Sequence, residues 1–360
     1  MLEAITRALD RFRGSGDAAV TVPPMDGALR PNFSIENASL LHSIEAPDNL
    51  VSYAGTILFS SGSRLLELRR EEGSAVEREL LSSPVTCLAS HASGTLAIGL
   101  AEGTIRLSGG LHDGTVLTQV GDRKIVCATA ATFADADTLL VCLGSQQCPA
   151  ADWKHDLMAN HASGSVWRID LKSLAATCLA DALAYPYGIV ADSCGRIIVS
   201  ESWRHRIVQV APESAPLTLY GDIPGYPARM VLDLESKELW LAVFAPRLQL
   251  IEFVLREDEY RKRMMKELDP EWWIAPSLHH PASFLEPLQG GGLKQLGELK
   301  PWAPSRSYGL LVRLDADCQP IESFHSRANG TRHGVTSCLP DGSSVIVASK
   351  GGDAIVAIEH

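Results

Sequence analysis

The chain has 360 residues, of which 46% are hydrophobic and 21% charged, and its formal net charge is −11 at pH 7. This balance is typical of a soluble globular protein and excludes a disordered or fibrous one. The acidic excess, with no stripe of Lys and Arg, argues against nucleic acid as a partner. The sequence contains no run of about 18 apolar residues, so we expect no membrane span.

The first predicted element is a short amphipathic helix over Met1–Arg13. Within it, Ile5, Ala8, Leu9 and Phe12 recur at the spacing of one helical face. The segment lacks the continuous apolar core and the small-residue cleavage site of a signal peptide. We therefore expect a cytoplasmic protein.

A repeated unit organises the rest of the chain. Each copy contains a turn residue, an apolar β-run, a short polar turn and a second β-run. Six copies are found, and they begin at Gly55, Gly94, Asp137, Gly195, Lys237 and Gly342. Three of the five intervals match the roughly 40–50 residues of a four-stranded propeller blade, and the two longer ones contain insertions. The sequence therefore predicts an all-β fold, a six-bladed β-propeller formed by residues 1–360 as a single domain.

Each copy follows a further short apolar segment, which we interpret as the innermost strand of its blade. These segments begin at Pro47, Ser83, Val126, Tyr185, Gly225 and Arg332. The sixth copy has only three strands before the chain ends at His360. Residues 38–44 would supply the fourth strand and remove an exposed sheet edge.

Two insertions interrupt the blades. The first, around Gln146 to Ser163, predicts a short helix and a turn. The second, residues 248–307 in blade 5, is too long to be a bare loop. Its segment 256–268 is helical by propensity, with Tyr260 and Met264 at helical spacing. A cap over the channel mouth and a helix packed against the side of the propeller are both compatible with this pattern.

The eight cysteines show no CxxC pair and no other metal-ligand spacing. In a chain without a secretion signal, we expect reduced and mostly buried thiols rather than disulfides or zinc ligands. The cysteines are Cys87, Cys127, Cys142, Cys148, Cys178, Cys194, Cys318 and Cys338. His155 and His161 are six residues apart, which does not put them on one helical face, and we expect no metal there.

Four sequence blocks lie in order between about Cys127 and His360, over roughly two thirds of the chain. They are DWKHDLMANHASGSVWRID, LAYPYGIVADSCGRIIVSESWRHRIVQV, IPGYPARMVLDLESKELWLAVFAPR and YGLLVRLDADCQPIESFH. In order and spacing these blocks resemble the strictosidine synthase-like family, which belongs to the propeller superfamily of paraoxonases, gluconolactonases and organophosphate hydrolases. The resemblance implies a six-bladed propeller, in agreement with the repeat count.

The resemblance also implies where a metal would lie. Metal-dependent relatives hold calcium at the channel floor with Glu, Asn and Asp side chains, which suit a hard cation. In this chain the matching positions carry different residues, namely Asp48 or Asn49, Thr129, Tyr187 and Ala228–Arg229. Because an arginine would repel the cation, we expect no metal and no cofactor. The glutamate that plant strictosidine synthases use to condense an amine with an aldehyde falls near Val335, so we do not expect that condensation.

The remaining chemistry lies in polar side chains that the inner strands would bring to the channel floor. Four are candidate catalytic residues: Arg229 would hold a carboxylate or a developing oxyanion, Tyr187 would donate a proton, and His333 or Asp48 would move one. The candidate substrate-binding residues are Asn49, Thr86, Thr129 and Glu201.

Each candidate also has a structural interpretation. Tyr187 could simply plug the channel, and Arg229 could pair with a neighbouring acid. Glu201 lies in a second strand, where a carboxylate is more often satisfied structurally, and His333 lies in a turn-like RHG sequence that could be surface.

Two functions from different classes fit these observations. The first is a metal-independent enzyme acting on a small carbonyl compound, by hydrolysis of a lactone or ester or by lyase or isomerase chemistry. The second is a non-catalytic propeller that binds a ligand or another protein and has lost the family's metal site. Arg and Tyr at the former ligand positions favour a remodelled pocket, since decay tends to leave small or apolar residues. The partner is then a small molecule, and the oligomeric state is left open.

Overall fold

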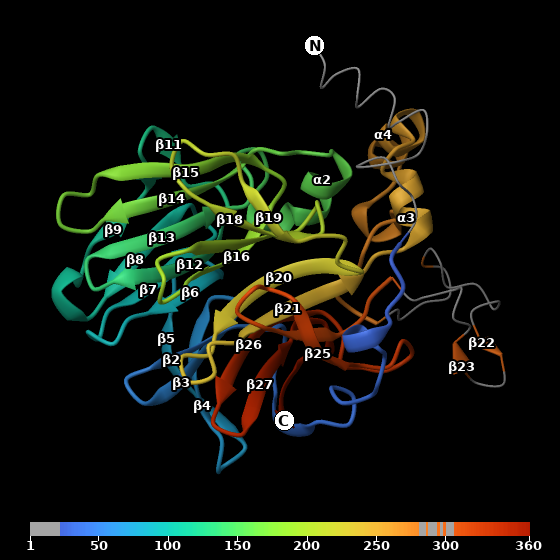
Figure 1. Ribbon diagram of the computed structural model, residues 1–360, viewed down its shortest axis with the longest axis horizontal. Coiled ribbons are helices and arrows are strands. Elements are labelled where there is room, and N and C mark those ends of the chain that lie inside the picture. Colours follow the sequence, from blue (N-terminus) through green and yellow to red (C-terminus); the bar gives the residue numbers. More distant parts are fainter. Residues whose placement is uncertain (1–21, 281–285, 287–293, 296–297, 300–305) are drawn as a thin grey trace.

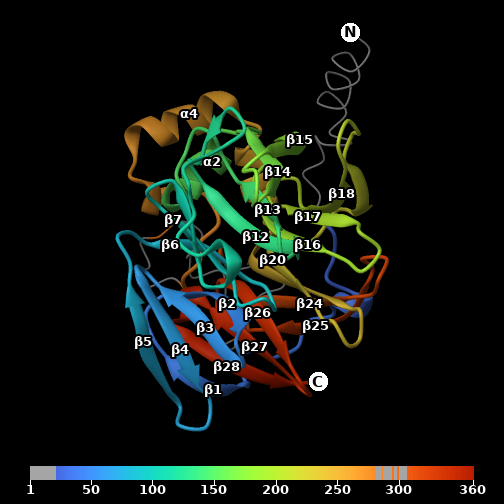
Figure 2. The same ribbon diagram turned by 90° about the vertical axis from the view of Figure 1, so that its left-hand side faces the viewer.

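The computed structural model describes residues 22–280, 286, 294–295, 298–299 and 306–360. The helix expected over residues 1–13 lies outside the described residues. The chain folds into six four-stranded antiparallel sheets, which are the blades of a β-propeller (Figures 1 and 2). Each innermost strand contacts the innermost strands of the two neighbouring blades, so the six of them form a closed ring. The predicted six-bladed all-β propeller is confirmed.

The first three blades follow one another in chain order. Blade 1 contains β2 (Pro47–Tyr53), β3 (Thr56–Ser61), β4 (Arg64–Arg69) and β5 (Ser74–Leu80). Blade 2 contains β6 (Val85–Ser90), β7 (Leu96–Leu100), β8 (Thr104–Ser108) and β9 (Val116–Leu117). Blade 3 contains β12 (Ala128–Asp135), β13 (Thr138–Leu143), β14 (Gly164–Asp170) and β15 (Ala176–Leu183). A two-stranded ribbon of β10 (Gln119–Val120) and β11 (Arg123–Lys124) connects blades 2 and 3.

The last three blades complete the ring. Blade 4 contains β16 (Pro186–Ala191), β17 (Ile197–Glu201), β18 (Arg206–Val210) and β19 (Leu217–Tyr220). Blade 5 contains β20 (Gly225–Leu232), β21 (Leu239–Pro246), β24 (Leu310–Leu314) and β25 (Pro320–His325). Blade 6 contains β26 (Val335–Asp341), β27 (Ser344–Ser349), β28 (Ala354–Glu359) and β1 (Ser39–Ser43).

Strand β1 closes the ring from the other end of the chain. It pairs antiparallel with β28, with Ser39 opposite Ala357 and Leu40 opposite Val356. The outer strand predicted within residues 38–44 is therefore confirmed. This pairing covers the edge that β28 would otherwise expose.

The hydrophobic core lies between neighbouring blades. All eight residues of β21 and all six of β27 are buried, because a second strand has a blade packed against each of its faces. Such strands read as continuous apolar runs rather than as alternating ones. Burying each Val, Leu or Ile side chain there contributes about 1.5–3 kcal/mol, and the packed blades hold the inner strands in fixed positions.

Both insertions leave the propeller at the same end. In an antiparallel blade the connection from the second to the third strand lies where the innermost strand begins. The first insertion joins β13 to β14 and contains α2 (Trp153–Met158), and the second joins β21 to β24. The second contains α3 (Gln249–Val254), α4 (Asp258–Glu267), the 3₁₀ turn η5 (Pro270–Trp272), β22 (Lys294–Gln295) and β23 (Glu298–Leu299). The helices predicted in both insertions are present, and α2 and α4 are in contact on one side of the molecule (Figures 1 and 2).

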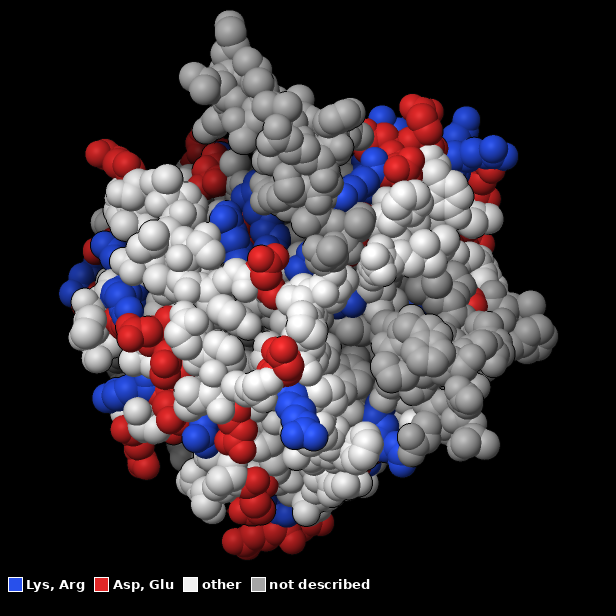
Figure 3. Space-filling model, turned by 45° about the vertical axis from the view of Figure 1, so that its right-hand side comes forward, with Lys and Arg blue, Asp and Glu red and all other residues white. Residues whose placement is uncertain are grey.

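Charged side chains are intermixed on the surface. Figure 3 shows basic and acidic groups interspersed over one face. In the described part of the chain, no helix combines the length and apolarity that a membrane crossing requires. All eight cysteines are free, and six of them are buried.

Candidate functional site

Every innermost strand carries a β-bulge close to its first residues. In β6, β12 and β16 the register with the second strand shifts so that one residue is left over, and these residues are Thr86, Thr129 and Tyr187. The shift in β2 follows Asp48, and that in β20 includes Ala228 and Arg229. A bulge re-aims a side chain relative to the ladder, and bulges are common beside functional sites. The six bulges therefore turn polar side chains inward at one level of the channel.

The sixth bulge identifies a residue that the sequence analysis missed. In β26, Val335 pairs with Ser349 and Ser337 pairs with Ala348, so Thr336 is the extra residue. Val335, near which the resemblance puts the family's glutamate position, is fully buried in the core. The polar side chain that blade 6 contributes is that of Thr336.

These bulges surround a cavity of about 190 Å³ at the end of the channel where the insertions emerge. Five of the sequence-predicted site residues line it: Asp48, Thr86, Thr129, Tyr187 and Arg229. Further lining residues come from the connections between second and third strands, including Ala150, Ala151, Trp153, Trp203, Leu278 and Lys350. Leu278 belongs to the blade 5 insertion, so that insertion forms part of the cavity wall.

A charged cluster of Asp48, Arg229 and Lys350 forms the polar part of the cavity, with Asp48 buried and the Lys350 side chain 31% exposed. Arg229 Nη1 donates to Asp48 Oδ1 at 2.7 Å, and Lys350 Nζ donates to Asp48 Oδ2 at 3.0 Å. Thr336 Oγ1 also donates to Asp48 Oδ1, at 2.8 Å. The second guanidinium nitrogen, Arg229 Nη2, donates to the carbonyl oxygen of Thr86 at 2.6 Å. Both carboxylate oxygens of Asp48 are therefore occupied by donors.

The electrostatics of the cluster follow from these contacts. Burial by itself would raise the pKa of Asp48, but the charges of Arg229 and Lys350 outweigh it and lower that pKa to about 2. The carboxylate of Asp48 raises the pKa of Lys350. Burial raises the pKa of the Tyr187 phenol. At neutral pH the described residues that line the cavity therefore include one carboxylate, two cations and a neutral phenol, which together carry a net charge of about +1.

Aromatic rings form another part of the cavity wall. Tyr185 stacks on Trp203 with ring centroids 4.4 Å apart, and Trp153 meets Phe244 edge-on at 5.3 Å. The Tyr187 ring connects this wall to the charged cluster, since the guanidinium carbon of Arg229 lies 5.0 Å from its centroid. A molecule in the cavity would meet both the two cations and the aromatic rings.

Three sequence-predicted residues do not line the cavity. Asn49 has a positive φ of 58° and donates through Nδ2 to Ser60 Oγ at 2.8 Å, so it supports the bulge after Asp48. Glu201 is fully buried, and its carboxylate pairs with Arg204 and Arg206 at 2.6 Å each. These contacts give both residues structural roles outside the cavity.

His333 is also placed away from the cavity. Its Nε2 lies 2.8 Å from the carbonyl oxygen of Arg327, and its Nδ1 lies 2.7 Å from Ser307 Oγ. Because a carbonyl only accepts, Nε2 carries the proton and Nδ1 accepts from the serine hydroxyl. Burial lowers the pKa of His333 to about 4. Neither nitrogen faces a ligand in the cavity, which corrects the expected role of His333 in proton transfer there.

Lys350 is the other important residue that the sequence analysis missed. It begins the short turn Lys350–Gly352 between β27 and β28, the same type of connection that carries Trp203 in blade 4 and the two insertions in blades 3 and 5. A sequence signal did exist. Once the blades are assigned, every connection between a second and a third strand points to the same channel mouth, so a lysine in one of them is a site candidate.

The residues present do not fit a calcium ion. Calcium takes six to eight oxygen ligands, several of them carboxylates. Among the described residues that line the cavity, Asp48 supplies the sole carboxylate, and Arg229 and Lys350 already bind both of its oxygens. A divalent cation here would face two positive side chains at close range.

The fold is shared with several solved propellers. A gluconolactonase from Xanthomonas campestris aligns with a TM-score of 0.55 at 14% identity, over 94% of this chain and 96% of that chain. Regucalcin from Agrobacterium tumefaciens, described as a calcium-binding protein, aligns with a TM-score of 0.52 at 12% identity over 89% and 92%. A luciferin-regenerating enzyme aligns with a TM-score of 0.51 at 11% identity over 90% and 93%. At these identities the likeness shows the fold.

No family model matches the sequence, and no curated protein matches it either.

Proposed function

We propose that this chain is a metal-independent small-molecule enzyme of the strictosidine synthase-like type. It would act on a small anionic carbonyl compound in the central cavity, by hydrolysis of a lactone or ester or by lyase or isomerase chemistry. The observation that carries this proposal is the charged cluster, in which two cations share a single carboxylate.

The cluster favours an anionic ligand. Arg229 and Lys350 bring two positive charges to a buried cavity and Asp48 returns one negative charge, so an anion would complete the balance. Charges in a water-poor site interact more strongly than in bulk water, and an arginine presents a rigid fork of donors to a carboxylate. The aromatic rings of Trp153, Tyr185 and Trp203 would hold an apolar or ring-shaped body beside that group.

The same donors can support a reaction. Positioned cations stabilise negative charge that develops on a carbonyl oxygen, as in an enolate or a tetrahedral intermediate. Lys350 and the phenol of Tyr187 both hold their protons at neutral pH, so both would donate hydrogen bonds to that oxygen. Asp48 is a weak base with a pKa of about 2, so its role is to orient Arg229 and Lys350. Substrate or solvent would therefore supply the accepting base.

Several broader features belong to this proposal. We propose that residues 1–360 form one domain in the cytoplasm and that residues 248–307 cap the channel mouth. The cap is supported by Leu278, which lines the cavity, and by the position of both insertions at one end of the propeller.

A second candidate is a propeller that binds a ligand or another protein without catalysis. The observation that favours it is the state of Asp48, whose two oxygens are bound by donors and which therefore lacks basic strength. Under this alternative the cavity would bind the same anions but convert none of them.

The experiment measures binding and turnover for a panel of small carboxylates, lactones and esters. Wild type is compared with Arg229→Lys, Lys350→Met and Tyr187→Phe, and Arg263→Leu is the matched control because Arg263 is exposed on α4. We expect turnover by the wild type and the control, and a loss of about 100-fold or more in Lys350→Met, as for removal of an oxyanion donor. Binding without turnover would support the second candidate. Unchanged binding and turnover in all three cavity variants would reject the proposed site.

A further inference from the structure

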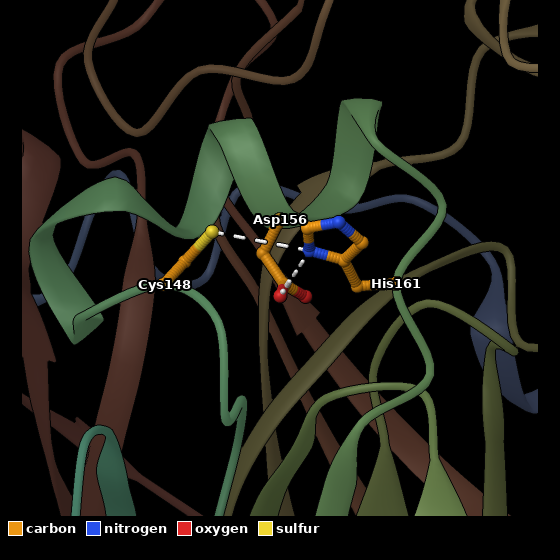
Figure 4. Close-up of side chains that lie close together, drawn as sticks. All are labelled: Cys148, Asp156 and His161. Carbon is orange, nitrogen blue, oxygen red and sulfur yellow. Dashed lines mark hydrogen bonds and ion pairs between the residues drawn. The ribbon is translucent and has the colours of Figure 1, made fainter.

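Three potential metal ligands converge in the first insertion, outside the central cavity. They are Cys148, Asp156 and His161, and Figure 4 shows their side chains directed toward one another beside α2. Cys148 Sγ lies 3.9 Å from His161 Nδ1, and His161 Nδ1 lies 3.2 Å from Asp156 Oδ1. Their ligand atoms all lie within 4.8 Å of one another.

We propose that Cys148, Asp156 and His161 bind a zinc ion that holds the first insertion in its folded conformation. Thiolate sulfur, imidazole nitrogen and carboxylate oxygen are the three ligand types that zinc takes in proteins. A tetrahedral zinc with ordinary bond lengths separates its ligand atoms by roughly 3.3–3.6 Å. The two distances given above bracket that range, so small side-chain adjustments would complete the site. Water would occupy the fourth position.

The surrounding contacts orient the ligands. Trp203 Nε1 donates to Asp156 Oδ2 at 2.8 Å, which leaves Oδ1 directed at His161. The backbone N–H of His161 donates to the carbonyl oxygen of Asp156 at 3.2 Å, and that of Cys148 donates to Ser145 Oγ at 3.1 Å. Outer partners of this kind hold the ligands of known metal sites in place.

An ion pair alone explains only part of this arrangement. The contact between Asp156 and His161 would be a sufficient pair by itself, but it leaves the buried thiol of Cys148 directed at the same imidazole nitrogen. Sulfur and oxygen converging on one nitrogen is the pattern expected around a shared ion. In a nucleophile–base–acid relay, the thiol and the carboxylate would instead contact different ring nitrogens.

The proposed ion would shape the cavity without entering it. Ala150, Ala151 and Trp153 lie between Cys148 and Asp156 in the chain, and all three line the cavity. Trp203 lines the cavity and also binds Asp156. A zinc ion would therefore stiffen one wall of the pocket, and the chemistry proposed for the pocket would remain independent of metal.

The experiment titrates the full chain, stripped of metal, with Zn²⁺ in competition with a chromophoric chelator. We expect one tightly bound equivalent in the wild type and binding weakened by about 100-fold or more in Cys148→Ser and His161→Gln. Cys194→Ser and His155→Gln are matched controls, because both replaced side chains are exposed and Cys194 lies in another blade. Both controls should bind as the wild type does.

Two further measurements separate lost ligation from misfolding. Co²⁺ in place of zinc should give thiolate-to-metal charge-transfer absorption in the wild type and none in Cys148→Ser. In the unmutated chain, Zn²⁺ should slow alkylation of Cys148 but not of Cys194, as resolved by mass spectrometry. Zinc binding that is equally weak in the wild type and Cys148→Ser, or alkylation of Cys148 unaffected by Zn²⁺, would overturn the proposal. Because no substrate is involved, neither result bears on the proposed enzyme activity.

Discussion

Arg229 and Asp48 meet across the channel from the innermost strands of blades 5 and 1, with Nη1 and Oδ1 2.7 Å apart. They are 181 positions apart in the chain. Both lie at bulges, and both side chains are almost entirely withdrawn from water. This pair couples the stability of the propeller to the charge of its cavity, and two of the predictions below follow directly from it.

The first prediction concerns that coupling. Asp48→Asn and Arg229→Met should each destabilise the chain by about 3 kcal/mol, because each breaks a buried ion pair. The first leaves Arg229 without its carboxylate, and the second leaves Lys350 as the cation that still pairs with Asp48. The free energy of unfolding lost in the double variant should be about 0.5–3 kcal/mol smaller than the sum of the losses in the two single variants. Urea unfolding of the four proteins measures this, and losses that simply add would contradict the pairing.

The second prediction concerns acid. The pKa of Asp48 is about 2 in the folded chain and 3.8 as an ordinary aspartate, so its ionisation stabilises the fold above about pH 4. As the pH falls from about 4 to 2, the unfolded chain takes up this proton first and the stabilisation, about 2 kcal/mol, is lost. The free-energy difference between wild type and Asp48→Asn should therefore shrink over this interval. The exposed Asp122→Asn serves as a control, and a constant difference for Asp48→Asn would contradict the prediction.

The third prediction concerns the blade 6 bulge. Thr336→Val removes the hydroxyl that donates to Asp48 Oδ1 at 2.8 Å while keeping the shape of the side chain. We expect the free energy of unfolding to fall by about 1.5–3 kcal/mol, as for the loss of a hydrogen bond to a charged group, and the pKa of Asp48 to rise. Thr336→Ser keeps the donor and should recover most of the loss. Equal stability of the Val and Ser variants in thermal or urea unfolding would show that the hydroxyl is not used.

The fourth prediction concerns two buried histidines. Burial lowers the pKa of both His325 and His333 from 6.5 to about 4. Below pH 6.5 the unfolded chain binds protons that the folded chain does not, so stability falls toward pH 4. Between pH 6.5 and 5, each histidine should lower the free energy of unfolding by about 1.5 kcal/mol. His333→Gln should remove about half of this pH dependence, and an unchanged slope in unfolding experiments would contradict the assignment.

Much of the architecture could be predicted from local patterns. The apolar runs of β21 and β27, interrupted at regular intervals by turn residues, show that second strands are covered on both faces. The closing strand was also predictable, because the last copy lacks a fourth strand and residues 38–44 have the pattern of one. Burial of apolar surface and the period of a strand are local properties, so they leave a signal in the sequence.

The candidate site was only partly predictable. Asp48, Thr86, Thr129, Tyr187 and Arg229 were found because the inner strands can be aligned with one another. Lys350 and Thr336 were missed, the first because it lies in a turn and the second because a bulge changes which residue of β26 faces inward. His333 was included because imidazole suits proton transfer, but its nitrogens are taken up by Ser307 and Arg327.

The sequence by itself therefore determined that this chain forms a closed six-bladed propeller with Asp48 and Arg229 at its channel, because strands and repeats follow from local patterns of apolar and turn residues. The tertiary structure alone decided that Asp48 is held by two cations and is a poor base. It also decided that the cavity is positive and that Cys148 meets His161. The physical reason is that pKa, charge balance and ligand geometry depend on distances between residues that are far apart in the chain, and only packing sets those distances.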